Sequence, residues 1–456
     1  MKRLIINNIK KTKQDDGKIL LEVLLSNENS EKKLWYKFDE RYEDFICDEL
    51  CDGIVVTFLP IAMKFGYDII ESAIPMSEKL YYNLTYHVIP QLYESDKKGL
   101  KKLNICIPRT NRCYGAKGVA TGMSRGVDSF ATVAEYKDFE LEDYRVSHYT
   151  YFNVGAHHGR DVLVGASKYK RSELFEKQLH DTKAYCEQYG HDLIVVDSNV
   201  SICVASKELF GRSMFSDSHT FRNLGTALLL QRGLNKYYYS AAYNLTDFSI
   251  ALNKDSAHYE KWLIRHLCTE NMEFYNSGQE WSRLEKVKEI VKLEESYKYL
   301  NVCLVDSNNC GVCVKCRRTL MELDSLGEDI LDKYRPVFDI DKYKNENRAR
   351  WFQDIWYMQK EKKSESKFIK EVLEQAIKTN PEILGLPNEE EEAESYTVYI
   401  TGNVVNVRAF PSKEASIISS CKKGESLKCI GKWERWLKIV LPDQREGYIH
   451  NTLCRK

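Results

Sequence analysis

The sequence has 456 residues, of which 43% are hydrophobic, and it carries 67 Lys plus Arg against 67 Asp plus Glu. This length predicts about two to four domains, and the hydrophobic content excludes a largely disordered chain. The zero net charge gives no support for a nucleic-acid partner, and no apolar run approaches the roughly 18 residues that would cross a bilayer. The apolar run after Arg3 is too short for an export signal, so we expect a cytoplasmic protein with no membrane partner.

The first part of the chain predicts a small mixed domain. Residues 1–7, 18–25 and 34–38 have the apolar content or alternation of β-strands, and a helical, apolar stretch begins at residue 52. We expect residues 1–104 to form an α+β accessory domain.

From residue 116 the pattern becomes an alternation of strands and helices. Such alternation predicts an α/β fold with a doubly wound parallel sheet, here within residues 105–335, and ligands in such sheets bind beyond the carboxyl ends of the strands. The predicted strands are 118–123, 147–154, 192–197 and 236–240, and the predicted helices are 128–136, 172–189, 221–232 and 282–300.

A short loop between the first of these strands and its helix has the composition of a phosphate-binding loop. Backbone amides at a helix N-terminus attract anions, Ser124 and Ser129 offer hydroxyl donors, and Asp128 can hold Mg²⁺ against phosphate oxygens. The alternative is an ordinary turn in which Asp128 or Ser129 caps the helix. The six residues resemble the Ser-Gly-Gly-X-Asp-Ser signature of PP-loop ATP pyrophosphatases, which implies an ATP-binding set of Ser124, Arg125, Gly126, Val127, Asp128 and Ser129.

Arg125 departs from that signature, because it stands where the family has its first glycine. Three interpretations are open. The residue adopts a positive φ at a cost on the order of 1 kcal/mol, its guanidinium clamps phosphate, or it blocks ATP and marks a degenerate loop.

Four cysteines lie close together in the sequence, at Cys303, Cys310, Cys313 and Cys316. Four thiolates at these spacings can hold one tetrahedral ion, and Zn²⁺ in a structural site is the first expectation. An iron–sulfur cluster is the competing interpretation.

The phosphate loop and the cysteine cluster together resemble the 7-cyano-7-deazaguanine synthase (QueC-like) family over roughly residues 115–325. The resemblance implies an adenine nucleotide alpha hydrolase-like fold, a structural zinc, and an ATP- and Mg²⁺-dependent ligase that activates a carboxylate, such as a deazaguanine, for attack by ammonia or a protein amine. The shorter first cysteine spacing and the extra domains indicate a paralogue, similar to those encoded in antiphage defence operons. Lys286 resembles the lysine at a helix start that reaches toward phosphate, so Asp128 and Lys286 are the expected catalytic pair.

Polar residues after the second and fourth strands, and one on the helix after the third strand, are candidates for the substrate pocket. The alternative for the histidine pair is an ordinary polar loop. The candidates for binding substrate or nucleotide are His157, His158, Arg222, Tyr243, Asn244 and Asp247.

The C-terminal part predicts a helical tail (336–387), an acidic linker (388–395) and a small β-barrel (396–456). The barrel resembles bacterial SH3-like domains through residues 403–412, Trp436–Ile439 and Gly447–Ile449, which implies docking to a protein partner. Trp433, Trp436 and Tyr448 are expected either in a binding face or in the barrel core.

Two other functions stay open at this point. A PP-loop tRNA-modifying enzyme would use a cysteine near the loop, for which Cys113 is the candidate. A degenerate PP-loop scaffold would instead bind proteins through residues 1–104 and 396–456, and Arg125 is the residue that supports it.

Overall fold

The computed structural model folds into two compact units, residues 1–309 and residues 310–456. None of the helices in the described part of the chain combines the length and apolar composition needed to span a membrane. The structure describes residues 1–155, 171–210, 215–250, 255–303, 306–360, 367–385, 391–409, 411, 413, 415–433 and 435–456.

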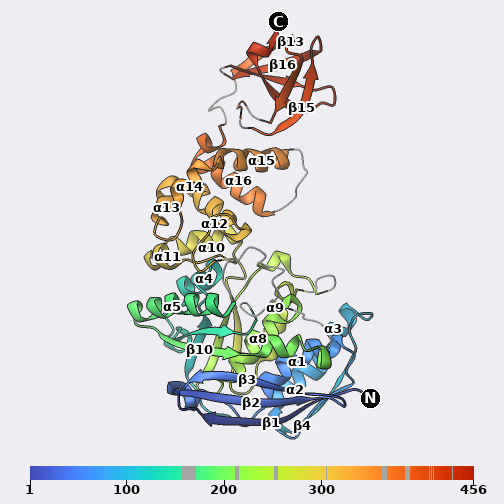
Figure 1. Cartoon of the computed structure of the whole chain (residues 1–456), viewed down its shortest axis with the longest axis vertical. Helices are drawn as coiled ribbons and strands as arrows, with labels where there is room; N and C mark the ends of the chain where they lie inside the picture. Colours follow the sequence, from blue (N-terminus) through green and yellow to red (C-terminus); the bar gives the residue numbers. More distant parts are fainter. Residues whose placement is uncertain are drawn as a thin grey trace. The chain divides into compact units, whose positions relative to one another are not determined.

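The first unit is built on one ten-stranded mixed sheet (Figure 1). Neighbouring strands within β12–β11–β8–β9–β10 pair in parallel, β3 then joins β10 antiparallel, and β1 to β3 are antiparallel to one another. In order across the sheet the strands are β12 (Glu273–Ser277), β11 (Leu234–Ser240), β8 (Gly118–Gly122), β9 (His148–Asn153), β10 (Asp192–Ser198), β3 (Glu31–Asp39), β2 (Lys18–Ser26), β1 (Arg3–Lys13), β4 (Ile69–Ser72) and β6 (Asn104–Cys106).

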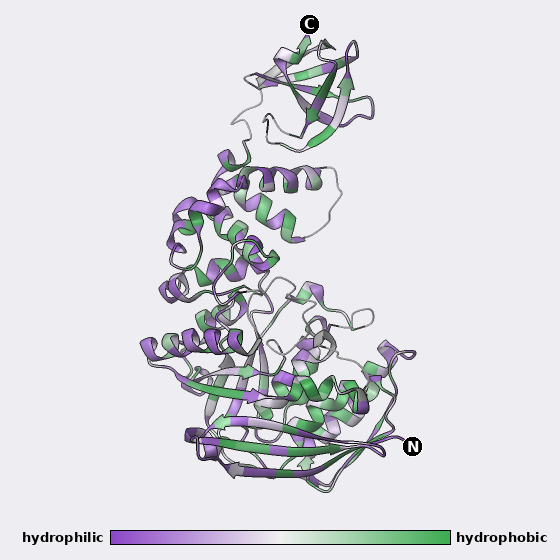
Figure 2. Cartoon of the chain, in the orientation of Figure 1, coloured by the Kyte–Doolittle hydropathy of each residue, from purple (hydrophilic) through white to green (hydrophobic). Residues whose placement is uncertain are grey.

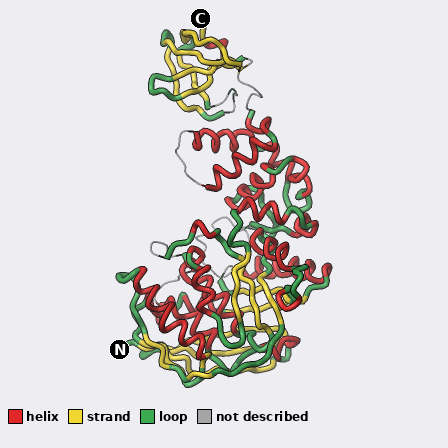
Figure 3. Tube along the Cα trace, turned by 180° about the vertical axis from the view of Figure 1, so that it is seen from behind, coloured by secondary structure: helices red, strands yellow, loops and turns green. Residues whose placement is uncertain are grey.

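Helices pack against this sheet, as the tube in Figure 3 shows from behind. The predicted strands and the first two predicted helices of the alternating region are present, with shifts of one or two residues at their ends. The predicted helix at 221–232 runs instead over Phe215–Leu228, and the predicted helix at 282–300 is two helices, α10 and α11. The helices of this unit are α1 (Asp52–Lys64), α2 (Glu78–Asn83), α3 (Ile89–Ser95), α4 (Val127–Tyr136), α5 (Arg171–Tyr189), α6 (Val200–Val204), α7 (Lys207–Phe210), α8 (Phe215–Leu228), α9 (Glu260–Leu263), α10 (Arg283–Ile290) and α11 (Glu294–Tyr299).

The strand order places a topological switch point next to β8. The chain passes from β8 to β9 and β10 in one direction and then returns to β11 on the other side of β8. Because crossovers between parallel strands are right-handed, this reversal puts α8 on the face opposite α4 and α5. Ligands of doubly wound sheets bind where the strand order reverses, so the carboxyl ends of β8 and β11 are the expected binding place.

The two compact units differ from the predicted domain ranges, since no boundary falls near residue 104. The N-terminal strands extend the parallel sheet through the β3–β10 pairing, for example Phe38 opposite Val196. The apolar helix α1, green in Figure 2, is buried along most of its length against α8. The two helices cross at glycines, because a Cβ on Gly53 would lie 2.3 Å from the Gly225 carbonyl oxygen. Residues 1–104 therefore share one core with the predicted nucleotide-binding region.

The second unit begins with helices and ends in an antiparallel sheet. Its helices are α12 (Val314–Ser325), α13 (Glu328–Lys333), α14 (Ile340–Asn345), α15 (Arg348–Lys360) and α16 (Lys367–Thr379). The seven-stranded sheet has the order β15 (Ile417–Lys422), β14 (Val404–Arg408), β18 (Glu446–His450), β17 (Trp436–Val440), β16 (Ser426–Trp433), β13 (Glu391–Ile400) and β19 (Cys454–Arg455).

The second half of the predicted acidic linker at 388–395 is part of a β-strand. Backbone pairing of Glu391 with Lys432 and of Glu392 with Gly431 places these acidic residues in β13. The sheet closes around alternating apolar side chains, which include Val398, Val407 and Ile439.

Candidate functional site

The candidate phosphate loop leaves β8 at the switch point and leads directly into α4. Met123 continues the strand pairing by donating its N–H to the Thr150 carbonyl at 2.8 Å, and Gly126 occupies the N-cap position of α4 with φ −78° and ψ 172°. Helix α4 is fixed at its base, because Glu135 accepts hydrogen bonds from the Ser277 hydroxyl at 2.7 Å and the Gly278 N–H at 3.2 Å. The loop is thus held on a rigid support.

The polar groups of the loop converge on one another. The hydroxyls of Ser124 and Ser129 lie 3.2 Å apart, and the Gly126 N–H donates to the Ser124 hydroxyl at 3.3 Å. Ser129 also donates to the Gly126 carbonyl at 3.0 Å. Phosphate oxygens at this point would replace the bonds between these groups by bonds to each of them.

Arg125 adopts a positive φ of 60°, a conformation that glycine takes without steric cost. Its side chain is 5% exposed and lies on α5, where the guanidinium donates to Thr182 Oγ1 at 3.2 Å and pairs with Asp181 Oδ2 at 3.3 Å. Burial lowers the pKa of Arg125, and the Asp181 carboxylate opposes that shift. Of the three interpretations given for Arg125, the structure shows the first, a positive φ. The guanidinium is bound by Thr182 and Asp181 of α5.

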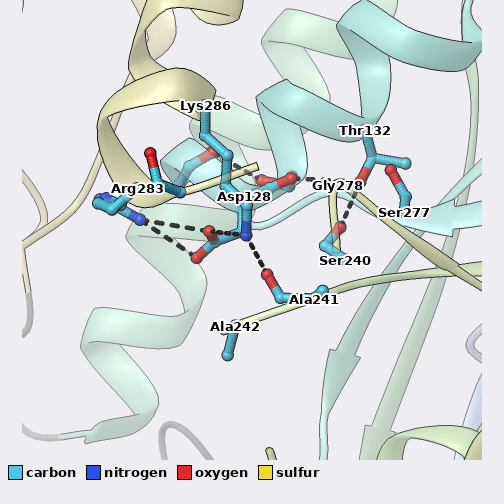
Figure 4. Close-up of polar contacts among 12 residues, drawn as sticks. Asp128, Thr132, Ser240, Ala241, Ala242, Ser277, Gly278, Arg283 and Lys286 are labelled. Carbon is cyan, nitrogen blue, oxygen red and sulfur yellow. Dashed lines mark hydrogen bonds and ion pairs between the residues drawn. The ribbon is translucent and has the colours of Figure 1, made fainter. Parts of the chain in front are cut away.

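Asp128, in the first turn of α4, is paired with two cations from α10 (Figure 4). Lys286 Nζ lies 3.1 Å from Asp128 Oδ1, and Arg283 Nη1 lies 3.3 Å from both carboxylate oxygens. Lys286 also donates to the Ala241 carbonyl just beyond β11. A reciprocal capping box between Ser282 and Glu285 starts α10 at this position and so aims both cations at Asp128.

Glu260 is a buried carboxylate beside this cluster that the sequence analysis missed. Its Oε1 accepts the Ala242 N–H at 3.0 Å, and its Oε2 has no hydrogen-bond partner among the described residues. Burial raises the pKa of Glu260 to about 8, an effect that the Ala242 N–H and Lys286 oppose and that Asp128 reinforces. The available signal was a single acidic residue in segment 259–264, whose other residues are Lys261 and four aromatic or apolar residues.

We expect Glu260→Gln to flatten the dependence of stability on pH between about pH 6 and 8. The folded pKa of Glu260 lies above its ordinary value of 4.5, so the folded protein binds more protons and loses stability as the pH rises toward 8. The loss across the whole interval from pH 4.5 to 8 is on the order of 3–5 kcal/mol, of which about 2–3 kcal/mol falls between pH 6 and 8. Urea unfolding from pH 4 to 9 would measure it, and glutamine, which cannot ionise, removes it.

Asp52 supplies the matched control for that measurement. It is buried, and its pKa is raised to about 6 by burial. Asp52→Asn should therefore change the slope only below about pH 6, whatever its effect on absolute stability. An unchanged slope above pH 6 in the Glu260→Gln variant would contradict the expectation.

The predicted substrate residues fall into three groups. His157 and His158 lie outside the described residues. Arg222, buried on α8, donates Nη1 to the Val154 carbonyl at 2.7 Å, beyond the carboxyl end of β9. The residues after β11 form a local structure in which Tyr243 stacks on His258 at 4.3 Å and Asn244 accepts the Thr246 N–H at 3.1 Å, in the turn that includes Asp247.

The four predicted metal ligands come together. The Sγ atoms of Cys303, Cys310, Cys313 and Cys316 all lie within 4.8 Å of one another, and Gly311 makes the turn between two of them with φ 74°. A tetrahedral zinc with Zn–S bonds of about 2.3 Å requires sulfur atoms about 3.8 Å apart. The donor set and its size therefore fit a metal such as zinc.

Two of the aromatic residues predicted for the barrel can be placed. Tyr448 is buried, and Trp436 lies edge-on to His450 with ring centroids 5.3 Å apart. The described part of Trp433 is its backbone, at the end of β16. Tyr448 is therefore unsuited to an exposed binding face, and the residue of this strand that enters the apolar core of the sheet is its neighbour Ile449.

Comparison with known proteins bears on this C-terminal sheet. No curated protein matches the sequence. Residues 403–453 match the family model of the bacterial SH3 domain, and they run from β14 through β18 in the antiparallel sheet. The chain therefore ends in a bacterial SH3 domain, of a kind that commonly mediates protein binding, and the predicted resemblance of this region is confirmed.

Proposed function

We propose that the chain is a QueC-like ligase that uses ATP to activate a carboxylate, releases pyrophosphate, and transfers the acyl group to a nitrogen nucleophile. The observation that carries the proposal is the constellation at the switch point. A loop with two hydroxyls enters the N-terminus of α4, and Asp128 in the first turn lies between Lys286 and Arg283. An anion-binding helix end, a carboxylate for Mg²⁺ and two phosphate-seeking cations are what pyrophosphate release needs.

The chain's own groups have distinct tasks in this reaction. The loop hydroxyls and amides bind the phosphates, and Asp128 would hold Mg²⁺, which neutralises charge on the pyrophosphate leaving group. Lys286 and Arg283 would exchange their pairing with Asp128 for pairing with phosphate oxygens. The substrate carboxylate attacks the α-phosphorus as the bond to the bridging oxygen breaks. The nitrogen nucleophile then attacks the acyl carbon, loses a proton, and AMP leaves with the C–O electron pair.

The other parts of the chain support the proposal without taking part in the chemistry. The four cysteines would hold a structural zinc, because all four ligand positions are occupied by protein. The bacterial SH3 domain provides a means of docking to a protein, consistent with a defence system in which the acceptor amine belongs to a partner.

The deciding experiment measures pyrophosphate release from ATP with a panel of deazaguanine carboxylates. We expect release that depends on the carboxylate and falls at least about 100-fold in Asp128→Ala. Asp138→Ala is the matched control, since Asp138 is exposed just beyond the other end of α4. No release with any carboxylate, together with undetectable ATP binding, would instead support the scaffold, and release that requires tRNA and Cys113 would support the RNA-modifying enzyme.

A further inference from the structure

One asparagine connects the candidate phosphate loop to the cysteine cluster. The Asn301 backbone N–H donates to the Arg125 carbonyl at 2.9 Å. The Asn301 side chain accepts the Cys303 N–H on Oδ1 at 3.1 Å and donates Nδ2 to the Ser307 carbonyl. The same residue thus touches the loop through its backbone and the first metal ligand through its side chain.

A second asparagine fastens the other end of this segment. Asn309, which precedes Cys310, accepts the Val302 N–H at 2.8 Å and donates to the Leu300 carbonyl at 2.8 Å. Asn309, directly before Cys310, is therefore hydrogen-bonded to residues 300–302, directly before Cys303. Holding the two cysteines on one ion fixes the position of these residues, and losing the ion releases them.

Arg125 makes the loop responsive to that position. Its backbone has a positive φ, which is sterically unfavourable for an arginine, so neighbouring contacts must hold it there. The side chain is held by α5 through Thr182 and Asp181, and the carbonyl is held by Asn301. Displacement of Asn301 would release the peptide between Arg125 and Gly126, whose N–H is one of the loop's donors.

We propose that Asn301 is a positioning residue that couples metal occupancy of the four-cysteine site to nucleotide binding at the phosphate loop. The inference rests on the proposed function for the identity of the nucleotide. The zinc-loaded protein binds Mg·ATP more tightly than the stripped protein, and by reciprocity Mg·ATP raises the affinity for zinc by the same factor. The four-cysteine site then has a role beyond local stability, because a chelator or a thiol oxidant weakens nucleotide binding at a loop that contains no cysteine.

The test is calorimetric titration of the full chain with Mg·ATP, in zinc-loaded and chelator-stripped forms. For the wild type we expect stripping to weaken binding about 10-fold, within the usual range of coupling between two sites. Zinc-loaded Asn301→Ala should keep its zinc but bind Mg·ATP like the stripped wild type, with less than about a 2-fold further change on stripping. Asn301→Asp keeps the acceptor for the Cys303 N–H and should restore part of the coupling. The matched control is Asn104→Ala, at an exposed position on β6.

Hydrogen exchange of the backbone amides at residues 123–127 provides a readout that does not depend on nucleotide. Exchange should accelerate on stripping in the wild type and should already be fast in zinc-loaded Asn301→Ala. Equal Mg·ATP affinities with and without zinc, and unchanged exchange, would overturn the coupling and leave the proposed function standing. Absence of Mg·ATP binding to the zinc-loaded wild type would count against the proposed function, while the exchange measurement would still decide the coupling.

Discussion

Asp128→Ala should lower the free energy of unfolding more than Lys286→Met, by about 2–4 kcal/mol against less than about 1.5 kcal/mol, although both variants should lose pyrophosphate release. The difference follows from unequal burial of the two charges, whose side chains are 35% and 3% exposed. Removing Asp128 leaves the Lys286 ammonium desolvated, with its hydrogen bond to the Ala241 carbonyl. Removing Lys286 takes a charge out of the interior and leaves Asp128 with Arg283 and water.

Glu260 makes this prediction sharper, because the effect of Glu260→Gln on the free energy of unfolding should change sign when Asp128 is replaced by alanine. In the wild type at pH 8, Glu260→Gln removes a poorly solvated carboxylate and should stabilise the fold. In the Asp128→Ala background, Glu260 no longer feels the Asp128 charge and can ionise as the counter-ion of Lys286. There the same substitution should destabilise. Urea unfolding of the four proteins gives the double-mutant cycle, and a sign that does not change would refute the arrangement.

The sequence was sufficient for the parts of the site that local pattern determines. The strand before Met123, the helix after Gly126 and the loop between them follow from apolar runs and from residues typical of a helix start. Arg283 was within reach of the same reasoning, since it lies three residues before Lys286 and so on the same face of α10. A search for paired basic residues at that spacing would have found it.

The rest depends on contacts between distant segments that leave no local signal. The pairing of β3 with β10 joins residues about 160 positions apart, and the glycines at which α1 and α8 cross look like isolated glycines in two ordinary helices. Glu260 and Asn301 act through backbone groups, of Ala242 and Arg125, to which any sequence could contribute. The amino-acid sequence therefore gives no sign of which backbone groups Glu260 and Asn301 contact.

The substitution Cys316→Ser should remove the metal from the four-cysteine site. Cys316 is buried in the first turn of α12, and a serine hydroxyl is a far weaker zinc ligand than a thiolate. We expect about one zinc per wild-type chain and none in the variant, because a structural site with three remaining thiolates loses its closed tetrahedral shell. Since metal binding in such sites contributes roughly 10–16 kcal/mol to local order, the segment around α12 should become protease-sensitive.

Elemental analysis and limited proteolysis would measure the two effects, with Cys106→Ser at an exposed cysteine as the matched control. Iron with a visible absorption band in the wild type would overturn the zinc assignment, and metal retained by Cys316→Ser would exclude Cys316 as a ligand. The same variant bears on the phosphate loop. Because Cys303 keeps its hydrogen bond to Asn301 but loses the ion that fixes it, faster amide exchange at residues 123–127 should accompany the loss of zinc.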